Sequence, residues 1–507
     1  MKLKFLCDAA SIACPAAEEE REIASIETDS RYVETGAMFV CIRGLHTDGH
    51  TYIADAVSAG ACCVLVEADA EVEPIKGVVF LKTNNTRRAV SLLYDAWYGF
   101  PTQKLKMIGV TGTNGKTSVT HMLRSILEAS LCRCGLIGTV GCESVGRHLA
   151  KSSRDPTANM TTPDPAELYR CLSEMVDDRV EYVLMEVTSH ALALGKLEPI
   201  HFDAAIFTNL TPEHLDFHGT MEAYADAKAA LFEKSKLSVI NLDSPYANRM
   251  IAHASGKVVT CAVRENADYT AEVLASSEAG VTYNVCSGST RLRVSCPIPG
   301  SFTMMNSMQA TICALELGFG ATVIKDALAS LTGVKGRMER VRLGLGADFT
   351  VLIDYAHTPD ALENLLRTAK QMKKNGQRVV LLFGCGGDRD KSKRAVMGKI
   401  ASDNADHVIV TSDNSRSEDP ETIIEEILAG IDPQKPHTVI PDRTAAIWYA
   451  VRNAQRGDVI LLAGKGHEEY EITHEGRSPF FEKEIVREAF ASRRRPQNNT
   501  DSTETEI

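Results

Sequence analysis

Met107-Ile108-Gly109-Val110-Thr111-Gly112-Thr113-Asn114-Gly115-Lys116-Thr117 is the stretch that decides the fold of this chain. The apolar run 105–110 predicts a short buried strand. Residues 118–127 predict a helix, because apolar side chains recur there at helical spacing. A Gly-rich turn between a strand and a helix forms a phosphate cradle, in which backbone N–H groups and the helix N-terminus face an anion. The stretch therefore predicts an α/β domain with a phosphate-binding loop.

The residue types of this loop match that chemistry. Gly112 and Gly115 let the backbone approach a ligand, Lys116 supplies charge for the distal phosphates, and the Thr117 hydroxyl can reach a magnesium ion. The usual first glycine is missing, because Val110 stands five residues before Gly115. The intact Gly-Lys-Thr still favours ATP over a turn without a ligand. We assign ATP binding to Gly112, Thr113, Asn114, Gly115, Lys116, Thr117 and Ser118.

Length and composition indicate a multidomain cytoplasmic protein. The 507 residues exceed the usual domain size, and 44% of them are hydrophobic. A formal net charge of -12 argues against nucleic-acid binding, which needs a basic surface. The sequence shows neither a signal-peptide pattern nor an apolar run of membrane length, so we expect no membrane insertion. The 14 cysteines lack metal or redox spacing, which predicts free thiols.

Changes in composition and pattern divide the chain into three α/β domains and a tail. A break at 99–102 precedes the phosphate loop. We predict a small N-terminal domain (1–102), a central ATPase-type domain with a parallel sheet (103–335), a Rossmann-like C-terminal domain (336–492) and a disordered tail (493–507). In the central domain, three β-rich runs predict an antiparallel extension of the sheet, and a helix is expected after them; the runs are 257–260, 281–285 and 291–294.

Two polar residues follow neighbouring strands predicted in the central domain. Glu186 follows the strand at 180–185, and His214 lies in the loop after the strand at 204–207. Ligands of open parallel sheets bind beyond the carboxyl ends of the strands. Magnesium prefers oxygen ligands, so Glu186 fits it well and His214 fits only as an auxiliary ligand. A lone loop histidine is often structural, and both interpretations of His214 remain open.

The C-terminal domain repeats one pattern four times. Its predicted strands each run into a Gly-rich or charged loop, and they lie at 351–353, 379–383, 408–410 and 459–463. We therefore expect four loops to line one crevice. Charged loops that only solvate a sheet edge would not explain why glycine clusters there with aspartate and arginine.

A phosphate cradle, a metal site and cationic side chains are the components of phosphoryl transfer. The residues alone leave three possibilities open. The phosphate stays on the acceptor, as in a small-molecule kinase, or it activates a carboxylate for attack by an amine. The third is a scaffold without activity, against which the intact set of Lys116, Glu186 and His214 speaks.

Across nearly its whole length the sequence resembles the Mur ligases. The matching motifs are Gly-Thr-Asn-Gly-Lys-Thr (112–117), Glu-Val-Thr-Ser-His-Ala-Leu (186–192), Asn-Leu-Thr-Pro-Glu-His-Leu-Asp-Phe-His-Gly (209–219), Gly-Arg-Met-Glu-Arg-Val (336–341), Asp-Tyr-Ala-His-Thr-Pro-Asp (354–360), Gly-Cys-Gly-Gly-Asp-Arg-Asp (384–390) and Gly-Lys-Gly-His-Glu (464–468). The resemblance implies that ATP phosphorylates the D-glutamate carboxylate of UDP-MurNAc-L-Ala-D-Glu. A diamino acid then attacks the acyl phosphate through a tetrahedral intermediate, in peptidoglycan precursor synthesis. We expect a monomer.

The resemblance also implies roles at the ATP and metal sites. Lys228, on a helix predicted at 221–234, matches the family's carboxylated lysine, whose carbamate binds metal together with Thr117, Glu186 and His214. From the residues alone, Lys228 would be a solvated helix position. Asn306, Arg337 and Asp354 match contacts to ATP, although Thr303 stands where relatives often carry asparagine.

For the nucleotide-sugar substrate, the resemblance implies a uridine site and a site nearer the peptide and pyrophosphate. The first set is Ser30, Leu45, His46 and Thr47, and the second is Thr161, Thr162, Thr188 and Lys196. From the residues alone, Asp29-Ser30-Arg31 is more typical of a helix cap or turn. Relatives usually carry arginine at Lys196, so the charge is kept but the bidentate fork is lost.

The residues that match the amino-acid pocket are Arg389, Asp413, Asn414, Ser415, Arg416, Gly464 and Glu468. In the family, Asp-Asn-Pro-Arg accompanies meso-diaminopimelate. The Arg416 guanidinium can bind the distal carboxylate that lysine lacks. Ser415 replaces the usual proline and loosens the loop, so lysine and ornithine remain alternatives. Folylpolyglutamate synthesis is a further alternative, which shares the phosphate loop but lacks the uridine domain and this selector loop.

Overall fold

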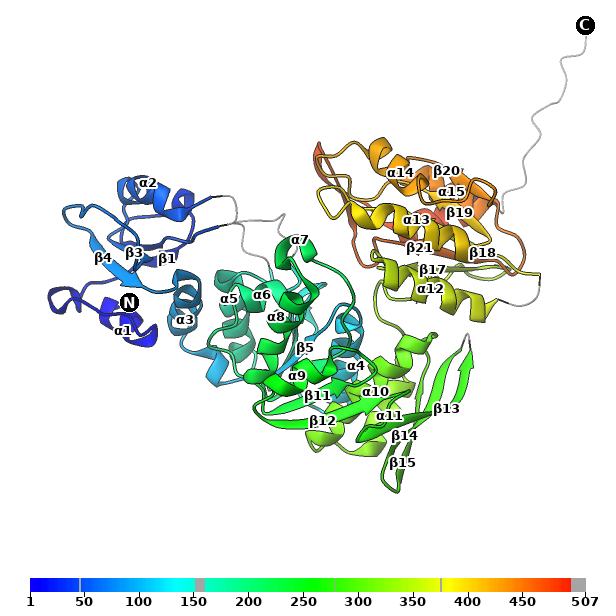
Figure 1. Cartoon of the computed structure of the whole chain (residues 1–507), viewed down its shortest axis with the longest axis horizontal. Coiled ribbons are helices and arrows are strands. Elements are labelled where there is room, and N and C mark those ends of the chain that lie inside the picture. Colours follow the sequence, from blue (N-terminus) through cyan, green and yellow to red (C-terminus); the bar gives the residue numbers. More distant parts are fainter. Residues whose placement is uncertain (45–46, 151–159, 278, 374–375, 494–507) are drawn as a thin grey trace, which may run out of the picture. The chain divides into compact units, whose positions relative to one another are not determined.

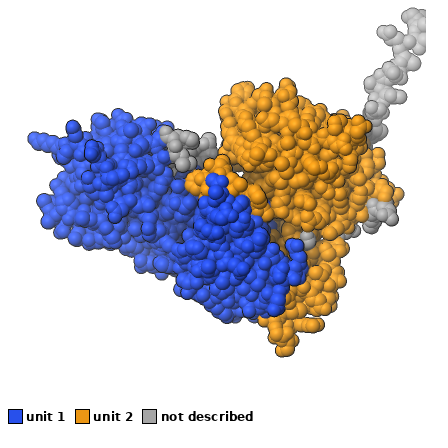
Figure 2. Space-filling model, in the orientation of Figure 1, with its two compact units in different colours: residues 1–210, 219–269, 309–323 blue, residues 211–218, 270–308, 324–507 orange. Residues whose placement is uncertain are grey.

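The structure, a computed structural model, describes residues 1–44, 47–150, 160–277, 279–373 and 376–493. The tail predicted to be disordered lies outside these residues except for Arg493. The chain forms two compact units (Figure 2): unit 1 comprises 1–210, 219–269 and 309–323, and unit 2 comprises 211–218, 270–308 and 324–507. Helices and parallel strands alternate in both units, which confirms the predicted α/β class (Figure 1).

The N-terminal part of unit 1 is a small parallel sheet with helices. Its strands pair in the order β1 (Ser25–Glu27), β2 (Ala37–Val40), β3 (Cys63–Glu67) and β4 (Val79–Thr83). The helices are α1 (Leu3–Ala9), α2 (Ile53–Ser58) and α3 (Thr86–Trp97), with short 3-10 turns at Ala16–Glu18, Ser30–Tyr32, Gly49–Tyr52 and Pro101–Gln103. All four residues of β2 are buried, as an apolar run in a covered parallel sheet should be.

The central sheet of unit 1 is organised around β5 (Lys106–Thr111). Its order is β12-β11-β10-β5-β9-β6-β7-β8, and every pair from β12 to β6 is parallel. The other strands are β6 (Cys134–Gly138), β7 (Gly141–Ser144), β8 (Arg147–His148), β9 (Tyr182–Glu186), β10 (Ala204–Phe207), β11 (Leu237–Asn241) and β12 (Lys257–Ala262). The carboxyl ends of β5, β9 and β10 therefore share one edge.

The helices of unit 1 cover this sheet. They are α4 (Lys116–Ala129), α5 (Pro165–Asp177), α6 (Ser189–Ala193), α8 (Met221–Glu233) and α9 (Ala247–His253). Gly109 of β5 permits the close packing of α8, because an added Cβ there would lie 3.1 Å from Leu231 Cδ1. This packing brings α8 beside the strand that leads into the phosphate loop.

The antiparallel extension exists, but one of its predicted strands belongs elsewhere. β13 (Tyr269–Ser277), β14 (Gly280–Ser287) and β15 (Thr290–Cys296) form the antiparallel meander. The run at 257–260 was wrongly assigned to it, because β12 pairs in parallel with β11. Most side chains of β13 are exposed, so this strand lacks the apolar alternation that would have revealed it.

The rest of unit 2 is a six-stranded sheet in the order β16-β17-β21-β18-β19-β20, with only β16 antiparallel. The strands are β16 (Glu339–Arg340), β17 (Thr350–Asp354), β18 (Val379–Phe383), β19 (His407–Val410), β20 (His437–Val439) and β21 (Val459–Ala463), and a hairpin joins β22 (Tyr470–Thr473) to β23 (Gly476–Pro479). The four predicted strands are confirmed, and their carboxyl ends share one edge. The prediction missed β20, a mostly exposed strand between β19 and β21.

The helices of the six-stranded sheet are α12 (Pro359–Met372), α13 (Ser392–Asn404), α14 (Pro420–Leu428), α15 (Arg443–Arg452) and α16 (Glu482–Arg493). The remaining helices among the described residues are α7 (Leu215–His218), α10 (Ser301–Glu316) and α11 (Ala321–Ala329).

All 14 cysteines are free thiols, as predicted. Within the described ranges, no helix has the length and apolar character to span a membrane. The monomeric state, the cytoplasmic location and the domain boundaries stay predictions.

Candidate functional site

The loop between β5 and α4 has the geometry of a phosphate cradle. Gly112 and Gly115 have φ angles of 144° and 89°, which favour glycine. An added Cβ at Gly112 would collide with the Thr208 hydroxyl, so the backbone needs this close approach. The helix α4 begins at Lys116, and the first N–H groups of a helix have no partners within it. The loop can therefore present backbone donors to an anion.

Residues after β10 hold the phosphate loop in place. The Asn114 N–H donates to Asn209 Oδ1 (2.9 Å), and the Asn114 carbonyl accepts from Thr208 Oγ1 (2.6 Å) and Asn209 Nδ2 (3.1 Å). Lys116 Nζ donates to the carbonyls of Gly112 (2.8 Å) and Thr113 (2.9 Å). The ammonium thus lies over the loop, at the place where a phosphate would need its charge. Ser118 is buried in the first turn of α4.

Glu186 and Thr117 meet at the shared sheet edge. The fully buried Glu186 carboxylate ends β9, and its Oε2 accepts from Thr117 Oγ1 (3.0 Å) and Thr139 Oγ1 (2.9 Å). Its Oε1 accepts from the Thr139 N–H (3.0 Å). These contacts place two kinds of oxygen donor that magnesium prefers beside the phosphate loop. Sequence reasoning missed Thr139, which follows the strand β6.

Lys228 is buried, so the residue-based expectation of a solvated position was wrong. Its side chain is 2% exposed, and Nζ donates to the Gly112 carbonyl (3.1 Å) and lies 4.7 Å from the centroid of the Tyr224 ring. The face of α8 that carries Lys228 packs on the phosphate loop, which a helical pattern alone does not reveal. A carbamate keeps one N–H, so a carboxylated Lys228 could keep this hydrogen bond.

His214 lies in unit 2, immediately before α7. It has a φ of 56°, and its Nε2 is 3.7 Å from Glu213 Oε2. In the part of the chain that the structure describes, no group of three or more His, Cys, Asp and Glu side chains is arranged to hold a metal ion. Within unit 1, a magnesium site beside Glu186 would therefore need the Thr117 hydroxyl, the Lys228 carbamate or phosphate oxygens. The role of His214 stays a prediction.

The other residues matched to ATP also belong to unit 2. Asp354 ends β17, and its carboxylate accepts from the N–H groups of Met338 (2.7 Å) and Ala356 (2.8 Å), while burial raises its pKa. The Arg337 guanidinium lies 4.6 Å from the centroid of the Tyr355 ring. Asn306 is buried in α10. The structure thus brings Arg337 and Asp354 to one sheet edge, and their contact with ATP stays a prediction.

A cavity of about 610 Å³ in unit 1 is lined by residues of the N-terminal part and of the segments 164–166 and 194–196. Three residues matched to the nucleotide sugar line it, namely Ser30, Thr47 and Lys196. Asp29 also caps the short turn at Ser30, so the two interpretations of this stretch are compatible. Leu45 and His46 lie outside the described residues.

The lining of this cavity combines aromatic and cationic groups. Phe39, Tyr52 and Tyr94 offer apolar surface, and the cations are Arg31, Arg87 and Lys196. Lys196 Nζ is 2.6 Å from Asp164 Oδ1, and Arg87 Nη2 donates to the Arg43 carbonyl at 2.6 Å. Aromatic faces suit a nucleobase, and cations suit a diphosphate. For Arg31, sequence reasoning weighed a ligand contact but favoured a cap or turn. It missed Arg87, because an arginine on a helix gives no pattern of its own.

Thr161, Thr162 and Thr188 do not line the cavity but cluster near Glu186. Thr162 Oγ1 donates to the Glu186 carbonyl (2.9 Å) and lies 3.1 Å from Thr188 Oγ1. The hydroxyls of Thr139 and Thr161 are 3.3 Å apart. The predicted substrate residues therefore form two groups within unit 1, one in the cavity and one beside the phosphate loop.

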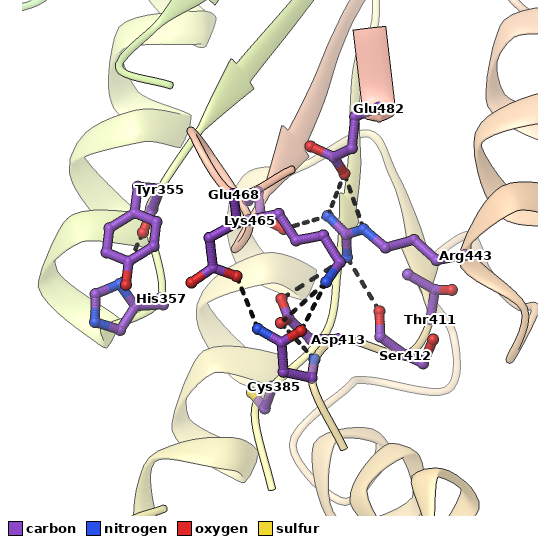
Figure 3. Close-up of polar contacts among 12 residues, drawn as sticks. Tyr355, His357, Cys385, Thr411, Ser412, Asp413, Arg443, Lys465, Glu468 and Glu482 are labelled. Atoms are coloured by element: carbon purple, nitrogen blue, oxygen red, sulfur yellow. Dashed lines mark hydrogen bonds and ion pairs between the residues drawn. The ribbon is translucent and has the colours of Figure 1, made fainter. Parts of the chain in front are cut away.

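Two of the residues matched to the amino acid, Asp413 and Glu468, lie close together at the edge of the six-stranded sheet (Figure 3). Asp413 and Asn414 follow β19, and Gly464 and Glu468 follow β21. Asn414 Nδ2 donates to Glu468 Oε2 (2.7 Å). Gly464 has a φ of 112°, and an added Cβ would collide with Asp413 Oδ2. The two loops are therefore in direct contact.

Arg389 and Arg416 both lie close to Gly386. An added Cβ at Gly386 would lie 3.0 Å from Arg416 Nη1 and 4.0 Å from Arg389 Cγ. Arg416 Nη1 donates to the Gly387 carbonyl (2.6 Å), and Arg389 Nη1 donates to the Asp388 carbonyl (3.0 Å). Burial and the charge of Arg416 lower the pKa of Arg389. Two neighbouring guanidinium groups that are hydrogen-bonded only to carbonyls in these contacts favour the binding of a carboxylate.

The same edge contains two buried cations that sequence reasoning missed, Arg443 and Lys465. Arg443 donates to the Ser412 carbonyl (3.1 Å), the Ala463 carbonyl (2.9 Å) and Glu482 Oε1 (2.9 Å from Nε). Burial tends to raise the pKa of Asp413, but Lys465 and Arg443 lower it below its ordinary value. Lys465 stands inside the Gly-Lys-Gly-His-Glu motif, so the motif was the available signal. Arg443 begins the helix α15 and lies in no motif, so the sequence offered no signal for it.

Comparison with known proteins now identifies the family. Three family models match the chain: "Mur ligase family, catalytic domain" at 22–96, "Mur ligase middle domain" at 110–314 and "Mur ligase, glutamate ligase domain" at 336–466. The chain belongs to the Mur ligase family. Its three-domain α/β architecture agrees with that of the Mur ligases.

Two curated Mur ligases and one solved structure are similar over nearly the full length, and all three are named UDP-N-acetylmuramoyl-L-alanyl-D-glutamate–2,6-diaminopimelate ligase. The protein from Caldanaerobacter subterraneus subsp. tengcongensis is 43% identical, covering 93% of this chain and 95% of that one. The protein from Clostridium botulinum is 40% identical, covering 93% and 96%. The solved structure is 33% identical with a TM-score of 0.67, covering 98% and 100%.

Proposed function

We propose that this Mur ligase joins meso-diaminopimelate to the D-glutamate of UDP-MurNAc-L-Ala-D-Glu at the expense of ATP, in peptidoglycan precursor synthesis. The observation that carries the choice of amino acid is the charge pattern in unit 2. Arg389 and Arg416 lie close to Gly386, while Asp413 and Glu468, which carry carboxylates, follow the ends of β19 and β21. A diamino diacid carries the complementary set of ammonium and carboxylate groups.

In the first step, a D-glutamate carboxylate oxygen attacks the γ-phosphorus of ATP, and ADP leaves. The backbone donors between Gly112 and Lys116 bind the phosphates, and the Lys116 ammonium turns from its loop carbonyls toward them. Magnesium, when bound, neutralises phosphate charge. Thr117, Glu186 and a carboxylated Lys228 would hold it, with His214 as a further ligand. Asn306, Arg337 and Asp354 would bind the rest of ATP.

In the second step, the amine of the diamino acid attacks the acyl carbon, and phosphate leaves as the tetrahedral intermediate collapses. Asp413 and Glu468 would bind an ammonium group, and Arg416 with Arg389 would bind the distal carboxylate. Asn414, Ser415 and Gly464 shape the loops between these groups. Lysine lacks the distal carboxylate and would leave the two guanidinium groups unmatched.

The cavity of unit 1 would hold the uridine diphosphate part of the other substrate. Its aromatic residues suit the base, and Ser30 and Thr47 supply polar contacts. Lys196, Arg31 and Arg87 supply positive charge for the diphosphate. Thr161, Thr162 and Thr188 would contact the peptide beside Glu186, where phosphoryl transfer takes place.

The test is phosphate release from ATP with UDP-MurNAc-L-Ala-D-Glu, comparing meso-diaminopimelate, lysine and ornithine, with the product mass measured in parallel. Wild type and Arg416→Ala are compared with Arg367→Ala as the control, since Arg367 is a 54% exposed arginine of α12. We expect phosphate only when both substrates are present, preference for meso-diaminopimelate, and loss of that preference in Arg416→Ala alone.

Each other outcome has a distinct meaning. Preference for lysine or ornithine would keep the ligase and refute the role of Arg416. A phosphorylated product released without an amine would make the protein a kinase. If no phosphate were released with any of the three amino acids, even with bicarbonate present, the proposed ligase activity would be refuted.

A further inference from the structure

Lys465 is a fully buried cation that the roles above do not use. Its side chain is 0% exposed, although lysine is rarely buried without partners. Nζ donates to Asn414 Oδ1 (2.9 Å) and to the Tyr470 carbonyl (3.1 Å), and it lies 4.0 Å from Asp413 Oδ1. Figure 3 shows the Lys465 side chain directed toward Asp413, beside Glu468. The ammonium thus faces the residues that line the amino-acid site.

These contacts fix the orientation of the Asn414 amide. Asn414 Oδ1 faces Lys465 Nζ and also the Ile472 N–H (3.0 Å). Both neighbours can only donate, so the atom between them must be the oxygen. Asn414 Nδ2 must then point to Glu468 Oε2, at 2.7 Å. Lys465 therefore determines which end of the amide the Glu468 carboxylate meets.

Lys465 also offsets the negative charge of the site. Burial and the neighbouring Asp413 raise the pKa of Glu468, and the Asn414 amide, Lys465 and His357 oppose the rise. Arg443 Nη1 lies 4.0 Å from Asp413 Oδ2 and also lowers the pKa of Asp413, so part of the compensating charge does not depend on Lys465. Tyr355 is a further titratable neighbour, and burial and Glu468 raise its pKa. Without Lys465, the two carboxylates would face each other with less compensating charge, and one of them would take up a proton more readily.

We propose that Lys465 is a positioning residue of the amino-acid site, which acts through Asn414 and the Asp413–Glu468 pair to set the orientation and charge that receive the ammonium group of a diamino acid. This inference rests on the proposed function. Lys465 does not touch the substrate in this role, because its donors are directed to Asn414, Tyr470 and Asp413.

The test is steady-state kinetics of Lys465→Met, which has a similar length but no donor or charge. The control is Lys399→Met, because Lys399 is a 72% exposed lysine of α13 in the same unit. For Lys465→Met we expect the KM for the amino acid to rise at least about 30-fold, while kcat and the KM values for ATP and the nucleotide sugar stay within about 3-fold. We also expect the acid limb of kcat/KM for the amino acid to move to higher pH.

Three further variants test the route through Asn414: Asn414→Leu, the double variant Lys465→Met/Asn414→Leu, and Asn414→Asp. In Lys465→Met/Asn414→Leu, the KM should rise no further than in the more affected single variant, because both changes remove one coupled contact. Asn414→Asp leaves Lys465 in place, so it keeps the proposal testable if Lys465→Met does not fold. It adds a third carboxylate, and we expect a higher KM for the amino acid and an acid limb at higher pH.

The kinetics of the wild-type protein separate a failure of this inference from a failure of the proposed function. If wild type uses none of the three amino acids, both fail. If wild type is active and the folded Lys465→Met keeps its KM and pH profile, only the inference fails. Equal losses in kcat and in all three KM values would indicate a structural role and would also overturn it, as would additive effects in the double variant or an unchanged Asn414→Asp.

Discussion

Replacing Arg443 by methionine should destabilise the C-terminal sheet strongly. The Arg443 side chain is fully buried, and it binds the Glu482 carboxylate, which is 3% exposed, through Nε (2.9 Å) and Nη2 (2.8 Å). It also donates to the carbonyls of Ser412 and Ala463. Methionine fills a similar volume but leaves one carboxylate and two carbonyls without this donor.

The expected magnitude follows from the burial of the ion pair. Removing one partner of a buried pair costs about 3–5 kcal/mol, because the other charge stays desolvated. For a folding unit of this size, that corresponds to a fall in Tm of roughly 6–20 °C. In Arg443→Met/Glu482→Leu the uncompensated carboxylate is gone, so we expect the double variant to be more stable than Arg443→Met by about 2 kcal/mol or more.

Urea unfolding followed by circular dichroism, with calorimetric Tm values, measures these differences. Arg452→Met is the matched control, because Arg452 is an exposed residue of the same helix α15; we expect it to change stability by no more than about 0.5 kcal/mol. If Arg443→Met lost less than about 1 kcal/mol, or if the double variant were no more stable than the single one, the reasoning about an uncompensated buried charge would be refuted.

Three further perturbations test other parts of the molecule. Lys116→Ala removes the counter-charge of the transferred phosphate, and we expect kcat to fall by at least about 10²–10³-fold in the phosphate-release assay; near-normal turnover would contradict the phosphate-loop assignment. Lys228→Ala should be nearly inactive and partly rescued by short carboxylic acids, whereas activity without rescue would speak against the carbamate. Hydrogen bonds from Arg394 lower the pKa of Glu418 to about 2 from 4.5, so its ionised form stabilises the fold above pH 4.5, and this contribution is lost as pH falls toward 2. The difference in unfolding free energy between wild type and Glu418→Gln should therefore shrink over that range, and a constant difference would refute the assignment.

The sequence was sufficient for the elements whose side chains are buried on both faces. The strands β18 and β21 are continuous apolar runs, and β5 is one from Met107 to Val110. Each leads into a Gly-rich loop, so both the strand and its functional end were predictable. The strands β13 and β20 were missed because their side chains are mostly exposed, and an exposed strand has no apolar pattern. The sequence also did not show whether a strand pairs in parallel or antiparallel, because the composition of β12 fits either direction.

Some functional residues could likewise be predicted from the sequence, and others could not. Glu186 was found from its position at a strand end alone. Position also predicted that the loop with Asp413 lines a crevice, and the family resemblance supplied the role of Asp413 itself. Lys228 and Arg443 were not found from their positions, because their roles depend on which helix face packs against a distant loop, and helical spacing does not give that face. The family resemblance supplied Lys228, but nothing in the sequence supplied Arg443.

The loop that carries Arg416 shows why one departure from the family pattern need not change the site. Ser415 stands where the family motif Asp-Asn-Pro-Arg leads one to expect proline, and a proline would restrict the backbone by itself. Here the Gly387 N–H donates to the Asn414 carbonyl (2.9 Å), the Arg416 N–H donates to the Ile472 carbonyl (3.0 Å), and an added Cβ at Gly387 would collide with the Ser415 carbonyl. Neighbouring loops thus hold the backbone on both sides of Ser415. The position of Arg416 is therefore set by tertiary contacts, which compensate for the missing ring.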